Sequence, residues 1–316
     1  MSAAPRILVV GAGHMGRLHA AKIAALRDAE RSVELAGVVD VDAARAESAG
    51  REFRAPAAKE LRTLLPGADA AIVAVPTRAH FEVVDAVLAA GLDVLVEKPI
   101  AASLDEAEAI LRRAREGGRV LRVGHLEWFN AALAAMRSRV RRPRFVEVHR
   151  MGPFPGRATD VDIVRDLMIH DIDIVQRLVG EEPVSIEGIG VPVLSSEIDI
   201  ANARLRFPGG CVANFTASRV SPTPLRKIRF FQADGYFSID FLAQSAVILR
   251  RRSEPPGIEI EPIRFDPADA LDAQLRDFLG AIATRDLDEA GAAAAVAALR
   301  TALRVMASLP PVDELA

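Results

Sequence analysis

The chain has 316 residues, of which 50% are hydrophobic and 26% are charged, and its formal net charge is -3. These values suit a globular protein of about two domains, and they leave no basic surface of the kind that binds nucleic acid or an anionic membrane. The single cysteine, Cys211, excludes internal disulfide bonds and cysteine-rich metal sites, and it fits a reducing compartment. We therefore expect a small-molecule partner.

The sequence contains no segment that we interpret as an export signal or a membrane span. Residues 1–6 lead directly into an apolar strand, without the charged region and cleavage site of a secretory signal. The most apolar later segment, Ala290–Ala307, is mostly alanine and carries Arg300 and Arg304, which is typical of a soluble helix. We expect a cytoplasmic protein.

The first predicted elements form a nucleotide-binding motif. Ile7–Val10 is a continuous apolar run, typical of a strand buried in a parallel sheet, and a helical segment covers Arg17–Arg27. The sequence between them is G-x-G-x-x-G, whose glycines permit a tight turn, close approach of a pyrophosphate and close helix packing. The anion would bind the amides of the helix N-terminus. We assign to cofactor binding the residues Gly11, Gly13, His14, Met15 and Gly16.

The second strand, Val33–Val39, ends in Asp40, which is placed to accept hydrogen bonds from an adenosine ribose. Val41 follows, without a cation to neutralise a 2'-phosphate. The sequence therefore favours NAD over NADP, although Arg45 is close enough in the chain to moderate that preference.

Strands and helices then alternate, which predicts a doubly wound parallel sheet with its ligand at the carboxyl ends of the strands. Pro76, Glu97 and Lys98 each follow such a strand. Lys98, between a buried strand and Pro99, is poorly placed for ordinary solvation, and its alternative role is a surface or phosphate-pairing lysine. The expected elements are strand Ala70–Val75, helix Arg78–Ala90, strand Leu92–Val96, a helix from a capping box at Ser103 to Glu116, and strand Arg119–Val123.

The second half predicts an α+β domain with a largely antiparallel, open-faced sheet. We expect a Rossmann domain over residues 1–124 and a substrate-binding and oligomerisation domain over 125–316. Too few helices remain to cover both sheet faces, so we expect a homodimer or homotetramer through that sheet. The expected elements are helix Trp128–Val140, strands Phe145–Met151, Asp199–Phe207, Cys211–Val220, Ile228–Phe231, Tyr236–Phe241, Ala246–Arg250 and Ile258–Phe265, a helix started by Asp266-Pro267 and running to Thr284, and helix Asp288–Ser308.

A helical segment in this half, Ile163–Val179, carries a polar stripe opposite its apolar one. Asp166 and His170 lie one turn apart on that stripe, followed by Asp173 and Arg177. A solvated helix face is the ordinary alternative. A metal site is another, but no cluster with recognised ligand spacing accompanies it.

The glycine loop, Glu97-Lys98-Pro99 and Asp166-x-x-x-His170 occur in this order, and the chain resembles the glucose-fructose oxidoreductase and inositol dehydrogenase family (Gfo/Idh/MocA) over essentially its whole length. Within that family, the chain is most similar to the UDP-N-acetylglucosamine 3-dehydrogenases. Three segments carry this similarity: Gly124–Glu127, Gly152–Pro155 and Arg165–Asp173. One departure is Asp162, where a small residue is expected, and it puts the shape of the substrate pocket in question.

The resemblance implies NAD-dependent oxidation of a sugar hydroxyl, with Lys98, Asp166 and His170 as catalytic residues. Whether Lys98 or His170 takes the proton is open. For substrate binding we select His125, Trp128, Arg157 and Asn214, with an exposed loop arginine as the alternative for Arg157. The expected reaction converts C3 of UDP-N-acetylglucosamine to a ketone for an aminotransferase. An inositol or monosaccharide dehydrogenase and a non-catalytic NAD-binding sensor are the alternatives.

Overall fold

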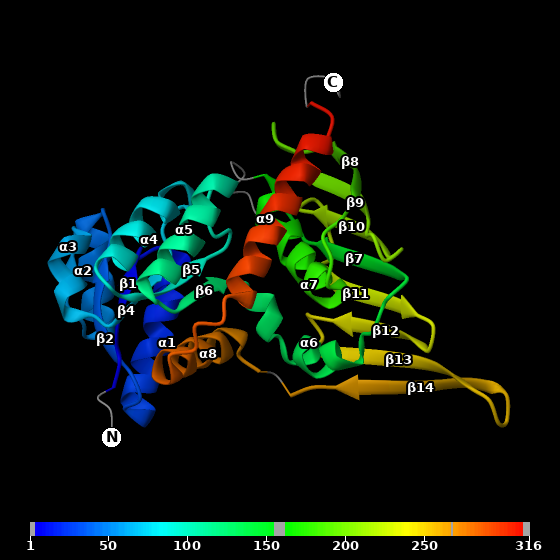
Figure 1. The fold of residues 1–316 in the computed structure, drawn as a ribbon, viewed down its shortest axis with the longest axis horizontal. Helices are drawn as coiled ribbons and strands as arrows, with labels where there is room; N and C mark the ends of the chain where they lie inside the picture. The colour runs from blue at the N-terminus through cyan, green and yellow to red at the C-terminus, as the bar shows by residue number, and fades with distance from the viewer. Residues whose placement is uncertain (1–3, 155–161, 267, 312–316) are drawn as a thin grey trace. The chain divides into compact units, whose positions relative to one another are not determined.

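The computed structural model describes residues 4–154, 162–266 and 268–311 (Figure 1). The chain forms two compact units, of which the first comprises Met1–Leu126 with Leu271–Val296, and the second comprises Glu127–Ala270 with Ala297–Ala316. The first change of unit lies close to the expected boundary at residue 124. The return of Leu271–Val296 to the first unit was not part of that expectation.

The first unit is built on a six-stranded parallel sheet of order β3-β2-β1-β4-β5-β6, so the predicted doubly wound sheet is confirmed. The strands are β1 (Arg6–Val10), β2 (Glu34–Val39), β3 (Ala57–Ala58), β4 (Ala70–Val73), β5 (Asp93–Glu97) and β6 (Leu121–Gly124). The helices are α1 (His14–Glu30), α2 (Ala43–Phe53), α3 (Leu61–Leu64), η1 (Leu65–Gly67), η2 (Thr77–Ala79), α4 (His80–Ala89), α5 (Leu104–Gly117) and α8 (Ala270–Thr284).

Local sequence explains where several of these helices begin. The predicted capping box is present, because the Ser103 hydroxyl accepts from the Glu106 amide while the Glu106 carboxylate accepts from the Ser103 amide. Asp42 is a simple N-cap of α2, because its side chain accepts from the amides of Ala44 and Arg45. The start predicted for α8 at Asp266-Pro267 includes Pro267, which lies outside the described residues; α8 begins at Ala270.

Helix α8 joins the first unit by hydrophobic packing. Leu275 and Phe278 are fully buried in a cluster that includes Ile23 of α1. Figure 1 shows α8 beside α1. Since burial of such side chains is worth roughly 1.5–3 kcal/mol each, this contact accounts for the return of the chain to its N-terminal unit.

The second unit is built on an eight-stranded sheet of order β14-β13-β12-β11-β7-β10-β9-β8. Its pairs are antiparallel except β7 with β10, which confirms the predicted largely antiparallel sheet. The strands are β7 (Phe145–Met151), β8 (Ser185–Val191), β9 (Ile200–Arg206), β10 (Val212–Ser218), β11 (Leu225–Gln232), β12 (Gly235–Asp240), β13 (Ser245–Arg252) and β14 (Gly257–Arg264). The helices are η3 (Leu126–Phe129), which spans the boundary between the units, α6 (Ala131–Met136), η4 (Arg137–Arg139), η5 (Val164–Met168) and α7 (Ile169–Val179).

The helix expected over Trp128–Val140 is wrong as one element, because it is broken into η3, α6 and η4. The break occurs at Asn130, which has an extended backbone and whose side chain accepts from the Ala132 amide. An N-cap of this kind begins a new helix, and the residues before it cannot continue the same one.

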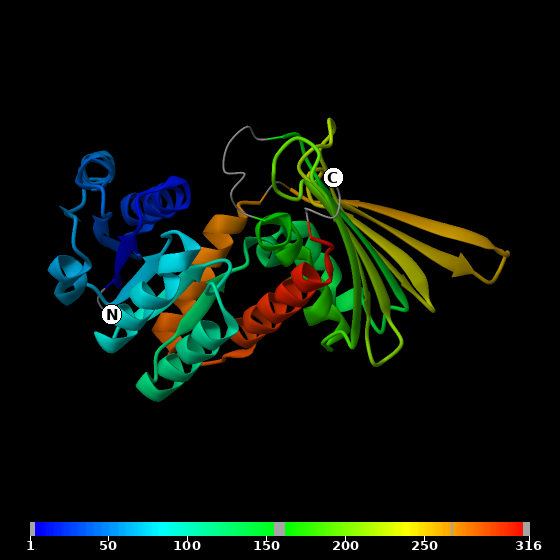
Figure 2. The ribbon, with the colours of Figure 1, turned by 90° about the horizontal axis from the view of Figure 1, so that it is seen from above.

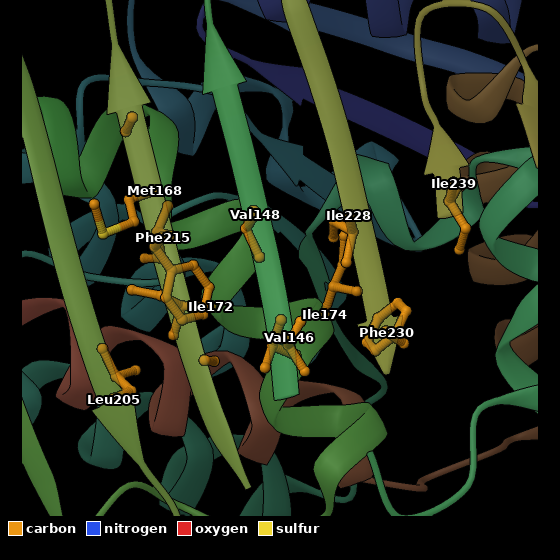
Figure 3. Packing of buried hydrophobic residues seen from close by; sticks show 14 of the residues in the cluster. Val146, Val148, Met168, Ile172, Ile174, Leu205, Phe215, Ile228, Phe230 and Ile239 are labelled. Carbon is orange, nitrogen blue, oxygen red and sulfur yellow. The ribbon is translucent and has the colours of Figure 1, made fainter. Parts of the chain in front are cut away.

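Helices cover one face of the eight-stranded sheet (Figure 2). Buried side chains of α7 meet those of the central strands in a single layer, as Figure 3 shows for Ile172 and Phe215. The other face carries partly exposed polar side chains, among them Glu147, Asn214 and Arg229. The open face predicted from the shortage of helices is therefore present within this unit.

The last helix, α9 (Ala290–Ser308), is the one helix among the described residues that is long and apolar enough to cross a membrane. Its Ala298, Ala302 and Val305 are fully buried in the core of the second unit. Arg300 pairs with Glu182 at 2.7 Å. These contacts are those of a core helix.

Candidate functional site

The strand ends of the first unit lie in register along one sheet edge. Val10 pairs with Val39 and Val73, and Val73 pairs with Val96. The residues that follow these strands therefore emerge at the same edge, as expected for the ligand side of a doubly wound sheet. They include the predicted cofactor residues Gly11, Asp40, Pro76 and Lys98, and the predicted cofactor residue Glu97 is itself the last residue of β5.

The glycine loop has the geometry of a phosphate-binding turn. Gly11 has φ of +99°, and a Cβ there would lie 2.4 Å from the Ala74 carbonyl oxygen. A Cβ on Gly16 would lie 1.7 Å from the Gly11 carbonyl oxygen, whereas one on Gly13 would meet no atom within 4 Å among the described residues. Gly13 therefore faces open space at the N-terminus of α1, whose first turn carries no acidic residue. Such a terminus attracts an anion.

Asp40 lies beside this loop and is 8% exposed. Its Oδ2 accepts from the Ala12 amide at 2.8 Å, and its Oδ1 accepts from the Asp42 amide at 2.8 Å. The Arg45 guanidinium lies 3.2 Å from Oδ1. The carboxylate and the glycine turn together fit a dinucleotide whose ribose diol donates to Asp40, with Arg45 as a cation at the same carboxylate.

His14 and Met15 begin α1, where His14 is exposed and Met15 is partly exposed. Lys98 is also partly exposed and follows the last residue of β5.

Two histidines of the first unit, to which the sequence assigned no partner, contact the Glu97–Pro99 segment. His19 Nε2 lies 2.7 Å from Glu97 Oε1. His80 Nδ1 lies 2.8 Å from the Pro99 carbonyl oxygen. The sequence provided only a weak signal for the contact of His19. This residue follows Gly16 by three positions, which places it on the buried side of α1.

In the second unit, Asp166 lies in η5, a π-helical turn that leads directly into α7. The Ile169 amide donates to the Val164 carbonyl, which is the i to i+5 pattern of a π-helix. Such turns are frequent at functional sites. Asp166 and His170 are both partly exposed, one turn apart as predicted.

The unexpected Asp162 has a structural role at the start of this turn. Its Oδ1 accepts from the Arg165 amide at 2.8 Å, and its other oxygen pairs with the Arg165 side chain. It therefore satisfies an amide that the first helical turn would leave without an acceptor.

The remainder of the polar stripe is structural. Asp173 is 1% exposed and pairs with Arg177 at 2.9 Å. The Arg177 and Arg137 guanidinium carbons lie 4.7 and 5.1 Å from the centroid of the Trp128 ring. The predicted substrate residue Trp128 is thus held beside α7 by two cations.

A buried ion network that the sequence did not reveal lies next to His170. Arg150 of β7 contacts Asp171 through two nitrogens, at 2.7 and 2.9 Å, and Glu127 through a third, at 2.7 Å. Burial alone would lower the pKa of Arg150, but the two carboxylates raise it well above its ordinary value. The guanidinium therefore stays charged and joins α7 to β7 and to Glu127.

The other predicted substrate residues, His125, Asn214 and Arg157, do not all lie in the same part of the structure that is described. His125 is buried, at 2% exposure, in the first unit after β6. Asn214 accepts from Arg204 at 2.9 Å on the open face of the sheet, opposite the face that α7 covers, and the proposed site omits it. Arg157 lies outside the described residues. Within the described part of the chain, no group of His, Cys, Asp or Glu could hold a metal ion.

Both halves of the chain match models of one protein family. Residues 5–125 match the oxidoreductase family with an NAD-binding Rossmann fold, and residues 132–238 match the GFO/IDH/MocA C-terminal domain. These matches confirm the predicted fold class and the predicted assignment to a family of NAD-binding oxidoreductases.

Individual relatives agree with the family models. UDP-N-acetylglucosamine 3-dehydrogenase of Acidithiobacillus ferrooxidans is 38% identical over 280 residues, which are 87% of this chain and 88% of that protein. A solved structure of that dehydrogenase has a TM-score of 0.91 at 36% identity and covers 97% of this chain and 98% of its own. A myo-inositol dehydrogenase of Streptomyces leeuwenhoekii is 31% identical over 68% of this chain and 70% of that protein.

Proposed function

The chain belongs to the Gfo/Idh/MocA family of NAD-binding oxidoreductases, and from this premise we propose that it oxidises the C3 hydroxyl of UDP-N-acetylglucosamine to a ketone. The observation that carries this proposal is the extent of the likeness to the Acidithiobacillus enzyme, which includes both units at 36% identity. The inositol dehydrogenase matches a smaller share of the chain at lower identity.

Within this proposal, Lys98, Asp166 and His170 are the catalytic residues. When bound, NAD supplies the hydride acceptor. Lys98 donates to the substrate hydroxyl oxygen and stabilises its alkoxide character, as a fixed cation does in a partly dry site. His170 takes the hydroxyl proton, since an imidazole titrates close to neutral pH, and Asp166 stabilises the imidazolium that forms.

The test is to follow the absorbance of reduced nicotinamide with NAD and a panel of substrates. We expect reduction with UDP-N-acetylglucosamine and little with free N-acetylglucosamine or myo-inositol. Reduction of the product with borodeuteride should place deuterium at C3. Deuterium at another carbon would refute the assigned position.

The same panel separates the alternatives. Reduction with an inositol but with no UDP-sugar would replace the nucleotide-sugar assignment by a polyol dehydrogenase. Tight NAD binding with no reduction on any sugar would instead indicate a non-catalytic sensor. The 3-keto sugar product is a ketone of the kind that an aminotransferase uses as its amino acceptor. We propose that the reaction takes place in the cytoplasm.

We also propose that two copies of the chain associate through the open face of the eight-stranded sheet. Phe231, which is 36% exposed, lies 5.5 Å from Phe145 and 5.0 Å from Tyr236 by ring centroids. Aromatic clusters of this kind are common at subunit interfaces. Light scattering at micromolar concentration should give a dimer or tetramer, and Phe231→Glu should shift it toward monomer; a monomeric parent protein would contradict this.

A further inference from the structure

Two buried histidines contact the residues on either side of Lys98. His19, on α1, is 0% exposed, and its Nε2 lies 2.7 Å from Glu97 Oε1. Its Nδ1 is buried without a hydrogen-bond partner among the described residues. The polar contact of this ring is therefore made through Nε2, with Nε2–H donating to the Glu97 carboxylate.

His80, the first residue of α4, is 1% exposed and lies between two carbonyl oxygens. Its Nδ1 is 2.8 Å from the Pro99 oxygen, and its Nε2 is 2.9 Å from the Val75 oxygen. Carbonyl oxygens only accept, so a neutral ring donates to one of them and an imidazolium donates to both. Burial lowers the pKa of His80, against the opposing effect of both carbonyls and of Glu97, so the neutral ring is the form at neutral pH.

Lys98 needs support of this kind because of its position in the chain. Strand β5 ends at Glu97, so the sheet ladder does not extend to Lys98. The segment Glu97–Pro99 is instead held from α1 through the Glu97 side chain and from α4 through the Pro99 carbonyl. A catalytic group has to be placed within about 0.5 Å, and this requires supporting contacts of its neighbours.

We propose that His19 and His80 are positioning residues that hold the Glu97–Pro99 segment from two sides and thereby direct the Lys98 side chain. The inference rests on the proposed catalytic role of Lys98. It adds the two contacts on which the rate provided by Lys98 depends. These are the Nε2–H of His19 on Glu97 and, with the single proton of neutral His80 assigned to Nδ1 by this proposal, the Nδ1–H of His80 on Pro99.

Amide side chains test these two contacts separately. The amide nitrogen of Asn takes the place of imidazole Nδ1, and that of Gln takes the place of Nε2. His19→Gln and His80→Asn therefore keep the donor that matters, while His19→Asn and His80→Gln lose it. We expect kcat to stay within about fivefold of the parent for the first two variants and to fall roughly 100-fold for the other two, the range for a misplaced catalytic group.

The thermal midpoint and the NAD dissociation constant are measured for each variant, so that loss of folding or of cofactor binding is separated from loss of turnover. If one mismatched variant does not fold, the pair at the other histidine decides. Equal loss of kcat in matched and mismatched variants at a histidine would overturn the proposal, since mere packing does not distinguish the two amides.

A double-mutant cycle tests whether the histidines act through Lys98. In a Lys98→Ala background, His19→Asn and His80→Gln should lower kcat by less than about twofold further, because the group that they position is gone. A full 100-fold additional loss would overturn the positioning role. An unchanged kcat in Lys98→Ala alone would refute the proposed catalytic role of Lys98, and this inference with it, whatever the histidine variants show.

Discussion

Arg150 and Asp171 form a buried ion pair with two contacts, in which Arg150 Nε lies 2.7 Å from Asp171 Oδ2 and Nη2 lies 2.9 Å from Oδ1. Asp171 directly follows His170 in the chain. The pair therefore fixes the turn of α7 that carries the proposed base against strand β7, and its loss is expected to affect stability and turnover together.

Asp171→Ala should destabilise the protein by roughly 3–5 kcal/mol, because it leaves a buried guanidinium without its main partner. The combined change Arg150→Met with Asp171→Leu should recover only part of that loss, because Glu127 then loses its contact with Arg150. Urea unfolding measures both effects. The exposed pair Arg276–Glu30 is the control, since it also has two contacts, at 2.6 and 3.0 Å, made by the two terminal nitrogens of the guanidinium. Glu30→Gln should cost far less than Asp171→Ala, because solvent screens the exposed pair. Similar costs at the two sites would contradict the role given to burial.

Lys98→Ala and His170→Ala should each lower kcat by roughly two to four orders of magnitude, the range for general acid-base and electrostatic groups. The NAD dissociation constant of His170→Ala should remain that of the parent. The controls are Lys59→Ala, an exposed lysine of the first unit, and His149→Ala, on the open face of the sheet. Near-parental activity in either catalytic variant would reject that residue's role.

Local patterns predicted the ends of these strands, because each buried apolar run is followed by a charged residue that does not contribute to the apolar core. Asp40 and Lys98 were identified in this way, and the register of the strands brings them to one edge. The partners of buried polar residues were not predictable. His19 and Glu97 are 78 residues apart, and Arg150 and Asp171 are 21 apart. No periodicity encodes which distant carboxylate a buried cation meets.

The return of α8 to the first unit was missed for a similar reason. Its apolar stripe, with Leu275 and Phe278, predicts a buried helix face but not the surface that covers it. The broken helix at Asn130 is a different case, because the capping residue was visible in the sequence. Its N-cap signal was outweighed by the apolar periodicity on both sides.

Asp40→Ala should shift cofactor preference toward NADP. The change removes the acceptor for a ribose diol and releases Arg45, which lies 3.2 Å from Asp40, to pair with a 2'-phosphate. A charged hydrogen bond is worth about 1.5–3 kcal/mol, so the ratio of kcat/KM for NAD over NADP should fall roughly 10- to 100-fold. In Asp40→Ala with Arg45→Ala, the gain with NADP should disappear. An unchanged ratio in the single variant would show that Asp40 does not select the cofactor.

Asp199 provides a test of acid stability in the second unit. It is 0% exposed, and its Oδ2 accepts from the amides of Val193, Leu194 and Ser195 at 2.6–2.9 Å. Arg219 Nε donates to its Oδ1 at 2.9 Å. Burial raises the pKa of Asp199. Hydrogen bonds from the backbone amides and the Ser195 hydroxyl together lower it by more, so that its pKa lies well below the ordinary value.

Since the folded pKa of Asp199 is lower than the unfolded one, the unfolded chain takes up the proton first as the pH falls. The stability that Asp199 contributes is therefore complete above about pH 5 and is lost progressively below it, by roughly 4 kcal/mol in total. Asp199→Asn removes this titration. The difference in free energy of unfolding between parent and variant should be constant from about pH 8 to pH 5 and should shrink toward about pH 3, as urea titrations would measure. A difference that stays constant or grows over the acid range would contradict the assignment, because it would mean that the folded carboxyl binds its proton no later than the unfolded one.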